Sequence, residues 1–135
     1  MSYLQKLLRA EAAGLVALLI CAALMGLYGY LESYVWSLKG SKLIIAPLNA
    51  SWLTFAYTGS IGLVAVLFYG APVYALLSHK RLVSWWSVIL VGAAPGAVIM
   101  FVDTNLGGWL LALGIFVALV SHILNVRFVP EKTAL

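Results

Sequence analysis

Four long apolar runs dominate this sequence, and each is long enough to cross a lipid bilayer. About 20 helical residues cover a hydrocarbon core of about 30 Å. Hydrophobic residues make up 64% of the chain and charged residues only 9%, which is far from the composition of a soluble domain. The runs lack the alternation of barrel strands, so each is expected to form a helix, the element that satisfies its own backbone in lipid. The predicted spans are residues 12–31, 52–77, 82–102 and 108–126.

The segments outside these runs are too small to bury a core of their own. The largest is a predicted outer loop over about residues 32–51. We therefore expect residues 1–135 to form one domain, an all-α integral membrane protein with four transmembrane helices. A short turn from Asp103 to Gly107 joins the third and fourth runs, so these two helices should form an antiparallel hairpin.

The distribution of lysine and arginine predicts the orientation of the chain in the membrane. With both termini cytoplasmic, six basic residues face the cytoplasm and two face outward. The inner set is Lys6, Arg9, Lys80, Arg81, Arg127 and Lys132, and the outer set is Lys39 and Lys42. Short loops with this bias favour a multi-pass protein of the bacterial inner membrane. Its basic rim would face anionic headgroups, and nothing in the sequence indicates nucleic acid as a partner.

Small and polar residues recur on one face of the third and fourth predicted helices. They are Gly92 and Gly96 in the third helix, and Gly114, Ala118, Ser121 and Asn125 in the fourth. Small residues allow helix backbones to approach closely, and polar ones hydrogen-bond across the contact. We expect these faces to pack against each other or against a partner helix, with a polar pathway as the alternative. Pro95 should bend the third helix and free a backbone group that a neighbour then meets.

The predicted outer loop contains an apolar stretch where polar residues would be usual. Leu43, Ile44 and Ile45 stand together before Pro47. Such a stretch either lies in the membrane interface or contacts a partner, because exposed apolar patches seldom lack a role.

Ionisable groups inside the bilayer would indicate transport, but the acidic residues fall at the edges of the predicted spans. Glu11 stands at the entrance of the first span, whereas Glu32 and Asp103 lie at the outer rim. These three are the candidate ion-binding residues, and Tyr57 and Thr58 are candidates for the wall of a site that opens outward. Small multidrug transporters are similar in size and helix number, but they use a glutamate inside the first span. Residues 12–31 contain none.

Cofactor and metal sites are not indicated by the remaining reactive side chains. Cys21 is the single cysteine, and His79 and His122 are the only histidines, which is too few for a zinc or thiolate site. Ser121 and His122 are adjacent and face apart on a helix. We therefore expect no catalytic residues, no cofactor and no metal.

The predicted function is that of a non-enzymatic inner-membrane protein that binds another membrane-embedded protein. In layout it is similar to small immunity proteins against pore-forming bacterial toxins and to small accessory subunits of membrane complexes. Its expected partners are the lipid bilayer and another membrane protein or further copies of itself. A small oligomeric transporter or channel that uses Glu11 is the alternative. A lipid-handling enzyme that uses Glu32 and Asp103 is a weaker one.

Overall fold

The computed structural model describes residues 2–40 and 45–128, and within these ranges all regular structure is helical. The all-α class is therefore confirmed. Leu43 and Ile44, two of the predicted contact residues, lie outside the described residues. The elements in chain order are α1 (Tyr3–Leu38), α2 (Pro47–Ala65), the π-helical η1 (Val66–Gly70), α3 (Ala71–His79), α4 (Trp85–Met100) and α5 (Thr104–Phe128).

Three helical stretches are long and apolar enough to cross a membrane. They are Tyr3–Leu38, Pro47–His79, which runs through α2, η1 and α3, and Thr104–Arg127. The third predicted span, residues 82–102, contains α4, which has only 16 residues and a length of about 24 Å at 1.5 Å per residue. The length and composition of these helices therefore suit a membrane protein. Three of the four predicted spans correspond to helices that are long enough by themselves to cross a membrane.

The outer loop is shorter than expected from the sequence. We predicted it over residues 32–51, but α1 continues to Leu38 and α2 already begins at Pro47. No glycine or proline interrupts α1 between Leu31 and Leu38, and Gly40 then takes the left-handed conformation with φ 71°. Proline is favoured in the first turn of a helix, so Pro47 starts α2 early.

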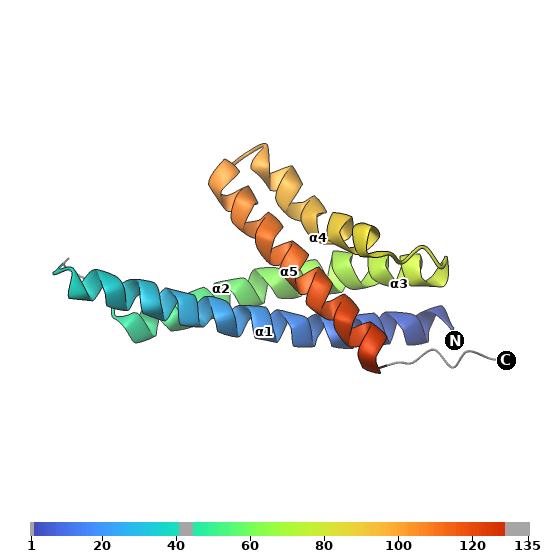
Figure 1. Cartoon of the computed structure of the whole chain (residues 1–135), viewed down its shortest axis with the longest axis horizontal. Coiled ribbons are helices and arrows are strands. Elements are labelled where there is room, and N and C mark those ends of the chain that lie inside the picture. Colours follow the sequence, from blue (N-terminus) through green and yellow to red (C-terminus); the bar gives the residue numbers. More distant parts are fainter. Residues whose placement is uncertain (1, 41–44, 129–135) are drawn as a thin grey trace.

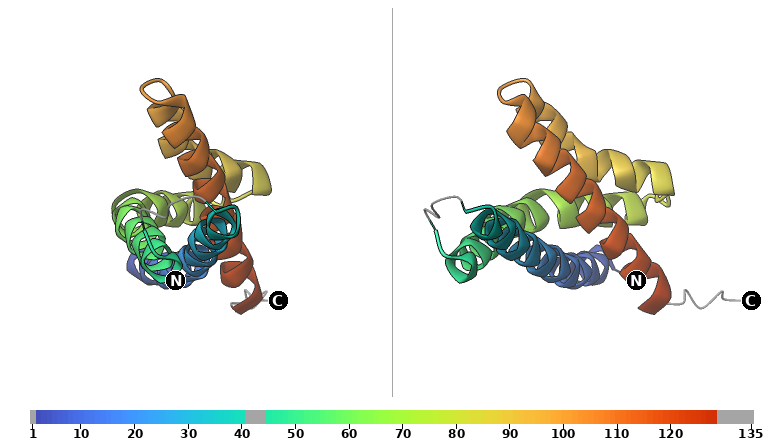
Figure 2. Two further views of the ribbon diagram at one scale, coloured as in Figure 1. Left: turned by 90° about the vertical axis from the view of Figure 1, so that its left-hand side faces the viewer. Right: turned by 60° about the vertical axis from the view of Figure 1, so that its left-hand side comes forward.

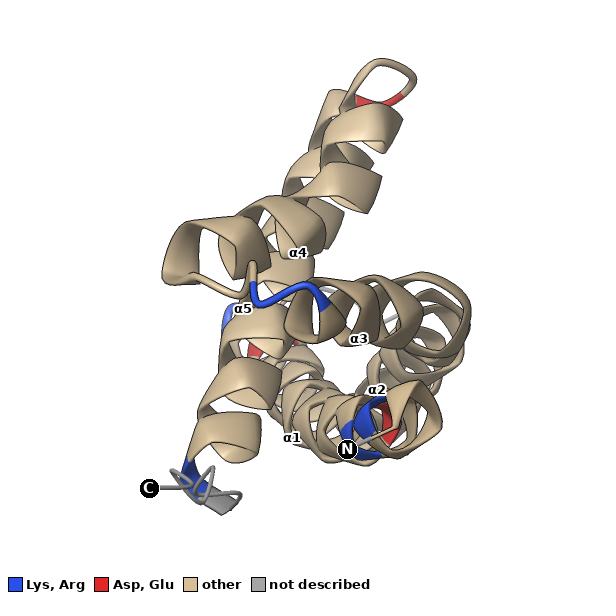
Figure 3. Cartoon of the chain, turned by 90° about the vertical axis from the view of Figure 1, so that its right-hand side faces the viewer, with Lys and Arg blue, Asp and Glu red and all other residues tan. Residues whose placement is uncertain are grey.

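The helices form two pairs that lie obliquely to each other. Figure 1 shows α1 alongside the continuous α2–η1–α3 helix, with the α4–α5 hairpin crossing this pair and α5 passing over α1. The views in Figure 2 show the hairpin rising away from the first pair. The start of α1, the α3–α4 turn and the end of α5 lie at one end of the molecule. Figure 3 looks onto this end, where several lysine and arginine positions are found.

A stripe of small residues on α1 holds the first pair together. Ala10 packs against Ala71 and Ala75 of α3. Further along α1, a Cβ atom built on Gly14 would lie 2.7 Å from Val66 Cγ1, which leaves no room for a side chain. The backbones therefore approach closely, as is typical of membrane helices.

The π-helical segment η1 ends at Gly70, two residues before Pro72. In a regular α-helix the ring of Pro72 would clash with the carbonyl of Phe68, four residues earlier. A π-helical turn is wider and relieves this clash. Such turns frequently occur at functional sites, and this one lines the cavity described next.

Candidate functional site

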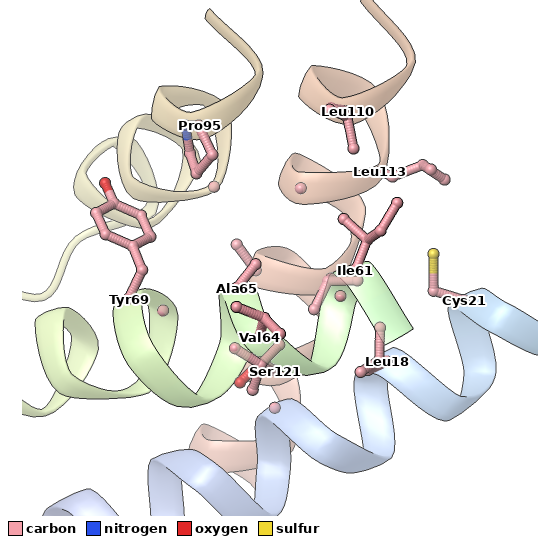
Figure 4. A pocket seen from close by; sticks show the side chains of 18 of the residues that line it. Leu18, Cys21, Ile61, Val64, Ala65, Tyr69, Pro95, Leu110, Leu113 and Ser121 are labelled. Atoms are coloured by element: carbon pink, nitrogen blue, oxygen red, sulfur yellow. The ribbon is translucent and has the colours of Figure 1, made fainter. Parts of the chain in front are cut away.

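An apolar groove of about 480 Å³ lies in the wedge between the two helix pairs. One wall is formed by α2, η1 and the start of α3, and the other by α4 and α5 (Figure 4). The floor is the stripe on α1, with Gly14, Leu18 and Cys21. The volume falls within the range of about 300–1,000 Å³ that is usual for binding sites of small molecules.

The groove is long and almost entirely apolar. Along one wall it extends from Tyr57 to Tyr74, which corresponds to about 26 Å of helix and approaches the thickness of a hydrocarbon core. Ile61 extends towards Leu110 and Leu113 across it (Figure 4). Hydroxyl groups are few among the lining residues, and are supplied by Tyr57, Thr58, Tyr69, Tyr74 and Ser121.

A polar contact joins the two walls at the narrow end of the groove. The Tyr74 hydroxyl is 2.9 Å from His122 Nδ1, and the Trp85 ring meets the His122 ring edge-on with centroids 4.7 Å apart. His122 is only 7% exposed and is the one buried polar side chain among the described residues. The contact therefore ties α3 to the α4–α5 hairpin where the wedge closes.

Two further polar groups lie between the Tyr74 end and the middle of the groove. Tyr69 extends from η1 towards α4, where Pro95 points into the cavity (Figure 4). Pro95 has no N–H group, so the carbonyl of Val91 lacks the donor that a regular helix would provide. Within the described part of the chain, the Tyr69 hydroxyl makes no hydrogen bond. Both Tyr69 and Val91 line the groove.

The small residues singled out in the sequence mainly hold the α4–α5 hairpin together. A Cβ atom on Gly92 would lie 2.6 Å from the Gly114 carbonyl oxygen and 2.7 Å from Ala118 Cβ. Gly96 similarly faces the backbone of Leu111. These surfaces are thus occupied within the chain, although Gly92, Gly114 and Ala118 also contribute to the groove wall.

The two polar residues of the α5 face have different environments. Ser121 lines the groove. Asn125 Nδ2 donates to the Ser121 carbonyl at 3.0 Å, within its own helix. The structure therefore does not bring these residues together as a polar pathway across helices.

None of the described residues that line the groove is acidic. Glu11 is half-buried, two turns inside α1, and Glu32 is exposed near the other end of this helix. Asp103 is exposed in the α4–α5 turn, where its Oδ1 accepts a hydrogen bond from the Leu106 amide at 3.0 Å. This turn stands clear of α1 (Figures 1 and 2), so Glu32 and Asp103 are not neighbours.

Tyr57 and Thr58 both line the groove, at the end away from Tyr74. Ile45 is exposed just before α2. No group of three or more metal-binding side chains occurs in the described ranges. Sequence reasoning missed the groove, Tyr69 and the contact between Tyr74 and His122. The one relevant signal was Pro72, near the end of the predicted span 52–77, because a proline inside a helix indicates an irregular turn such as η1.

Comparison with protein-family models, with curated proteins and with solved structures finds no match to this chain. The groove, its length and the chemistry of its lining are therefore the basis for a functional proposal.

Proposed function

We propose that this protein is a non-enzymatic membrane protein that binds a transmembrane helix of another membrane-embedded protein in the groove. The observation that carries the proposal is the length of the apolar groove, about 26 Å from Tyr57 to Tyr74. A lipid tail lies within one leaflet, about half of the 30 Å hydrocarbon core, whereas a transmembrane helix spans all of it. The groove matches the longer occupant.

The size of the groove indicates how a helix would bind. A helix with its side chains is about 10–12 Å across, so a cavity of about 480 Å³ admits one face rather than the whole helix. Large apolar side chains of the partner would insert between Ile61 and Val64 on one wall and Leu110 and Leu113 on the other. Close van der Waals packing of this kind drives helix association in lipid.

The exposure of α2 supports the same proposal. None of its 19 residues, all of them described, is buried. Tyr57 and Ile61 on its groove side expose more than half of their surface. In the membrane this face is covered by lipid or by another protein, and a large apolar face beside a groove is typical of an interaction site. An accessory subunit and an immunity-type protein against a membrane-active toxin would both use it in this way.

The proposal includes a membrane arrangement. We place α1, the continuous α2–η1–α3 helix, α4 and α5 across the bilayer as one domain. The end that carries the start of α1, the α3–α4 turn and the end of α5 lies in the cytoplasm of a bacterial cell. The short α4 is extended by apolar residues on both sides, Leu82 and Val83 before it and Phe101 and Val102 after it. Phe101 and Val102 are almost fully exposed, which suits contact with lipid.

The test is to fill the groove without disturbing the chain's own packing. Ile61→Trp places a large ring in the groove, whereas Leu63→Trp adds the same ring on an exposed position outside it. Proteins that copurify with the wild type in mild detergent are identified by mass spectrometry. We expect Ile61→Trp to lower recovery of the specific partner at least tenfold, and Leu63→Trp to leave it unchanged.

Equal recovery with both variants would contradict the proposal. If the copurifying chain is a second copy of this protein in a defined oligomer, the result favours the transporter or channel alternative. Flux in reconstituted vesicles and its loss in Glu11→Gln would then be measured.

A further inference from the structure

We propose that the groove selects a transmembrane helix that carries a hydrogen-bond donor near the middle of the membrane, which is recognised by the Val91 carbonyl and the Tyr69 hydroxyl. The inference rests on the proposed function and specifies its partner. A helix with a central Asn, Gln, Ser or Thr belongs to this class, and a purely aliphatic helix does not.

The carbonyl of Val91 provides the first half of the recognition element. Because Pro95 cannot donate, this oxygen loses its usual intrahelical partner. An unsatisfied backbone group in hydrocarbon is unfavourable by several kcal/mol. Its partial negative charge in an otherwise apolar groove is electrostatically complementary to a donor on the occupant.

The hydroxyl of Tyr69 provides the second half from the opposite wall. A phenol both donates and accepts hydrogen bonds, so it can bind the same polar side chain that donates to Val91. The π-helical turn of η1 presents Tyr69 to the cavity, where it extends towards α4 (Figure 4). Tyr69 lines the groove, and its hydroxyl has no hydrogen-bond partner among the described residues.

Tyr69 and Pro95 lie at the same distance along their helices from the α3–α4 turn. Tyr69 precedes the last residue of α3, His79, by ten residues, and Pro95 follows the first residue of α4, Trp85, by ten residues. Each is therefore about 15 Å along its helix from the α3–α4 turn, which is about half of the hydrocarbon thickness. Val91, whose carbonyl is the acceptor, follows Trp85 by six residues and so lies about 9 Å along α4. With the α3–α4 turn at the membrane surface, the Val91 carbonyl and the Tyr69 hydroxyl both lie inside the hydrocarbon core, where a hydrogen bond discriminates strongly between partner helices.

The experiment uses two labelled synthetic helices as probes. Both are 20-residue transmembrane peptides of leucine, and one has a single asparagine at its centre. The purified full-length protein is reconstituted in vesicles, and binding is measured by energy transfer at a peptide density too low for self-association. Interhelical hydrogen bonds contribute about 0.6–2 kcal/mol, so we expect the asparagine peptide to bind about 3–30-fold more tightly.

Two variants and one control identify the groups responsible. Tyr69→Phe removes only the hydroxyl and should reduce the preference for asparagine several-fold. Pro95→Ala restores an N–H group to the helix, which can then satisfy the Val91 carbonyl, and should also reduce the preference. Tyr34→Phe removes the same group from an exposed position of α1 outside the groove, and should leave the preference unchanged.

The outcomes separate this inference from the proposed function. If Ile61→Trp prevents binding of both peptides, but wild type binds them equally or Tyr69→Phe keeps the full preference, the groove binds helices and the polar selection is refuted. If neither peptide binds the wild type, or if Ile61→Trp has no effect on their binding, the proposed function itself is refuted.

Discussion

The contact between α4 and α5 at Gly92 allows a quantitative test of the packing. In Gly92→Ala the new methyl group would stand 2.6 Å from the Gly114 carbonyl oxygen and 2.7 Å from Ala118 Cβ. Ordinary van der Waals contact begins at 3.4 Å, so α5 must move away by about 0.8 Å. One of the obstacles is backbone, and a rotamer change cannot relieve it.

The expected destabilisation follows from two opposing effects. Insertion of a methyl group into a packed contact destabilises by about 1–3 kcal/mol. Replacing glycine by alanine inside a helix stabilises by up to about 1 kcal/mol. The net loss of unfolding free energy in Gly92→Ala should therefore be about 1–2 kcal/mol, measured by denaturant titration in detergent micelles.

The matched control is Gly59→Ala in α2, because a Cβ atom there meets no atom within 4 Å. This variant keeps the helix-propensity gain and lacks the clash, so its stability should be unchanged or slightly higher. Combining Gly92→Ala with Ala118→Gly removes one obstacle and should recover part of the loss. If Gly92→Ala is as stable as Gly59→Ala, the close approach of α4 and α5 is refuted.

Three further changes test other contacts of the fold. Tyr74→Phe removes the hydrogen bond to His122 and should lower the unfolding free energy by about 1 kcal/mol; an unchanged value would mean that the contact does not join the walls. Asp103→Ala removes the cap of α5 and should destabilise by about 0.5–2 kcal/mol in the same titration, whereas Asp103→Asn, which also caps, should lose less. Arg81 has a φ of 56°, so Arg81→Gly should raise the midpoint of unfolding by relieving backbone strain, and a lower midpoint would contradict this.

Sequence patterns predicted the helical elements well because their cause is local. An apolar run of about 20 residues without strand alternation forms a helix in lipid, because only a helix satisfies all of its backbone hydrogen bonds within the run. The spacing of Gly92 with Gly96, and of Gly114 with Ala118, also placed small residues on single faces. Both faces do meet within the hairpin, although Gly96 lies opposite Leu111. The extent of α1 was underestimated, because a helix can continue beyond the membrane where composition becomes more polar.

The candidate site was much less predictable. Tyr57, Thr58 and Ser121 do line the groove, but they were considered for different reasons, and the acidic candidates lie elsewhere. Tyr69 carried no distinguishing pattern, since its role depends on an irregular turn and on a wall contributed by another hairpin. Helices α1, α4 and α5 each carry a face of small residues, and any two of these faces could pack together. The spacing of small residues alone therefore does not determine which helices are in contact.

The sequence by itself determined that this chain is helical and suited to a membrane, and where close backbone contacts are available, because helix formation and small-residue spacing are local properties. Only the tertiary structure decided the oblique crossing of the two helix pairs, and with it the groove. That angle depends on how side chains of distant segments interdigitate, at Tyr28 with Trp109 on one side and at Tyr74 with His122 on the other.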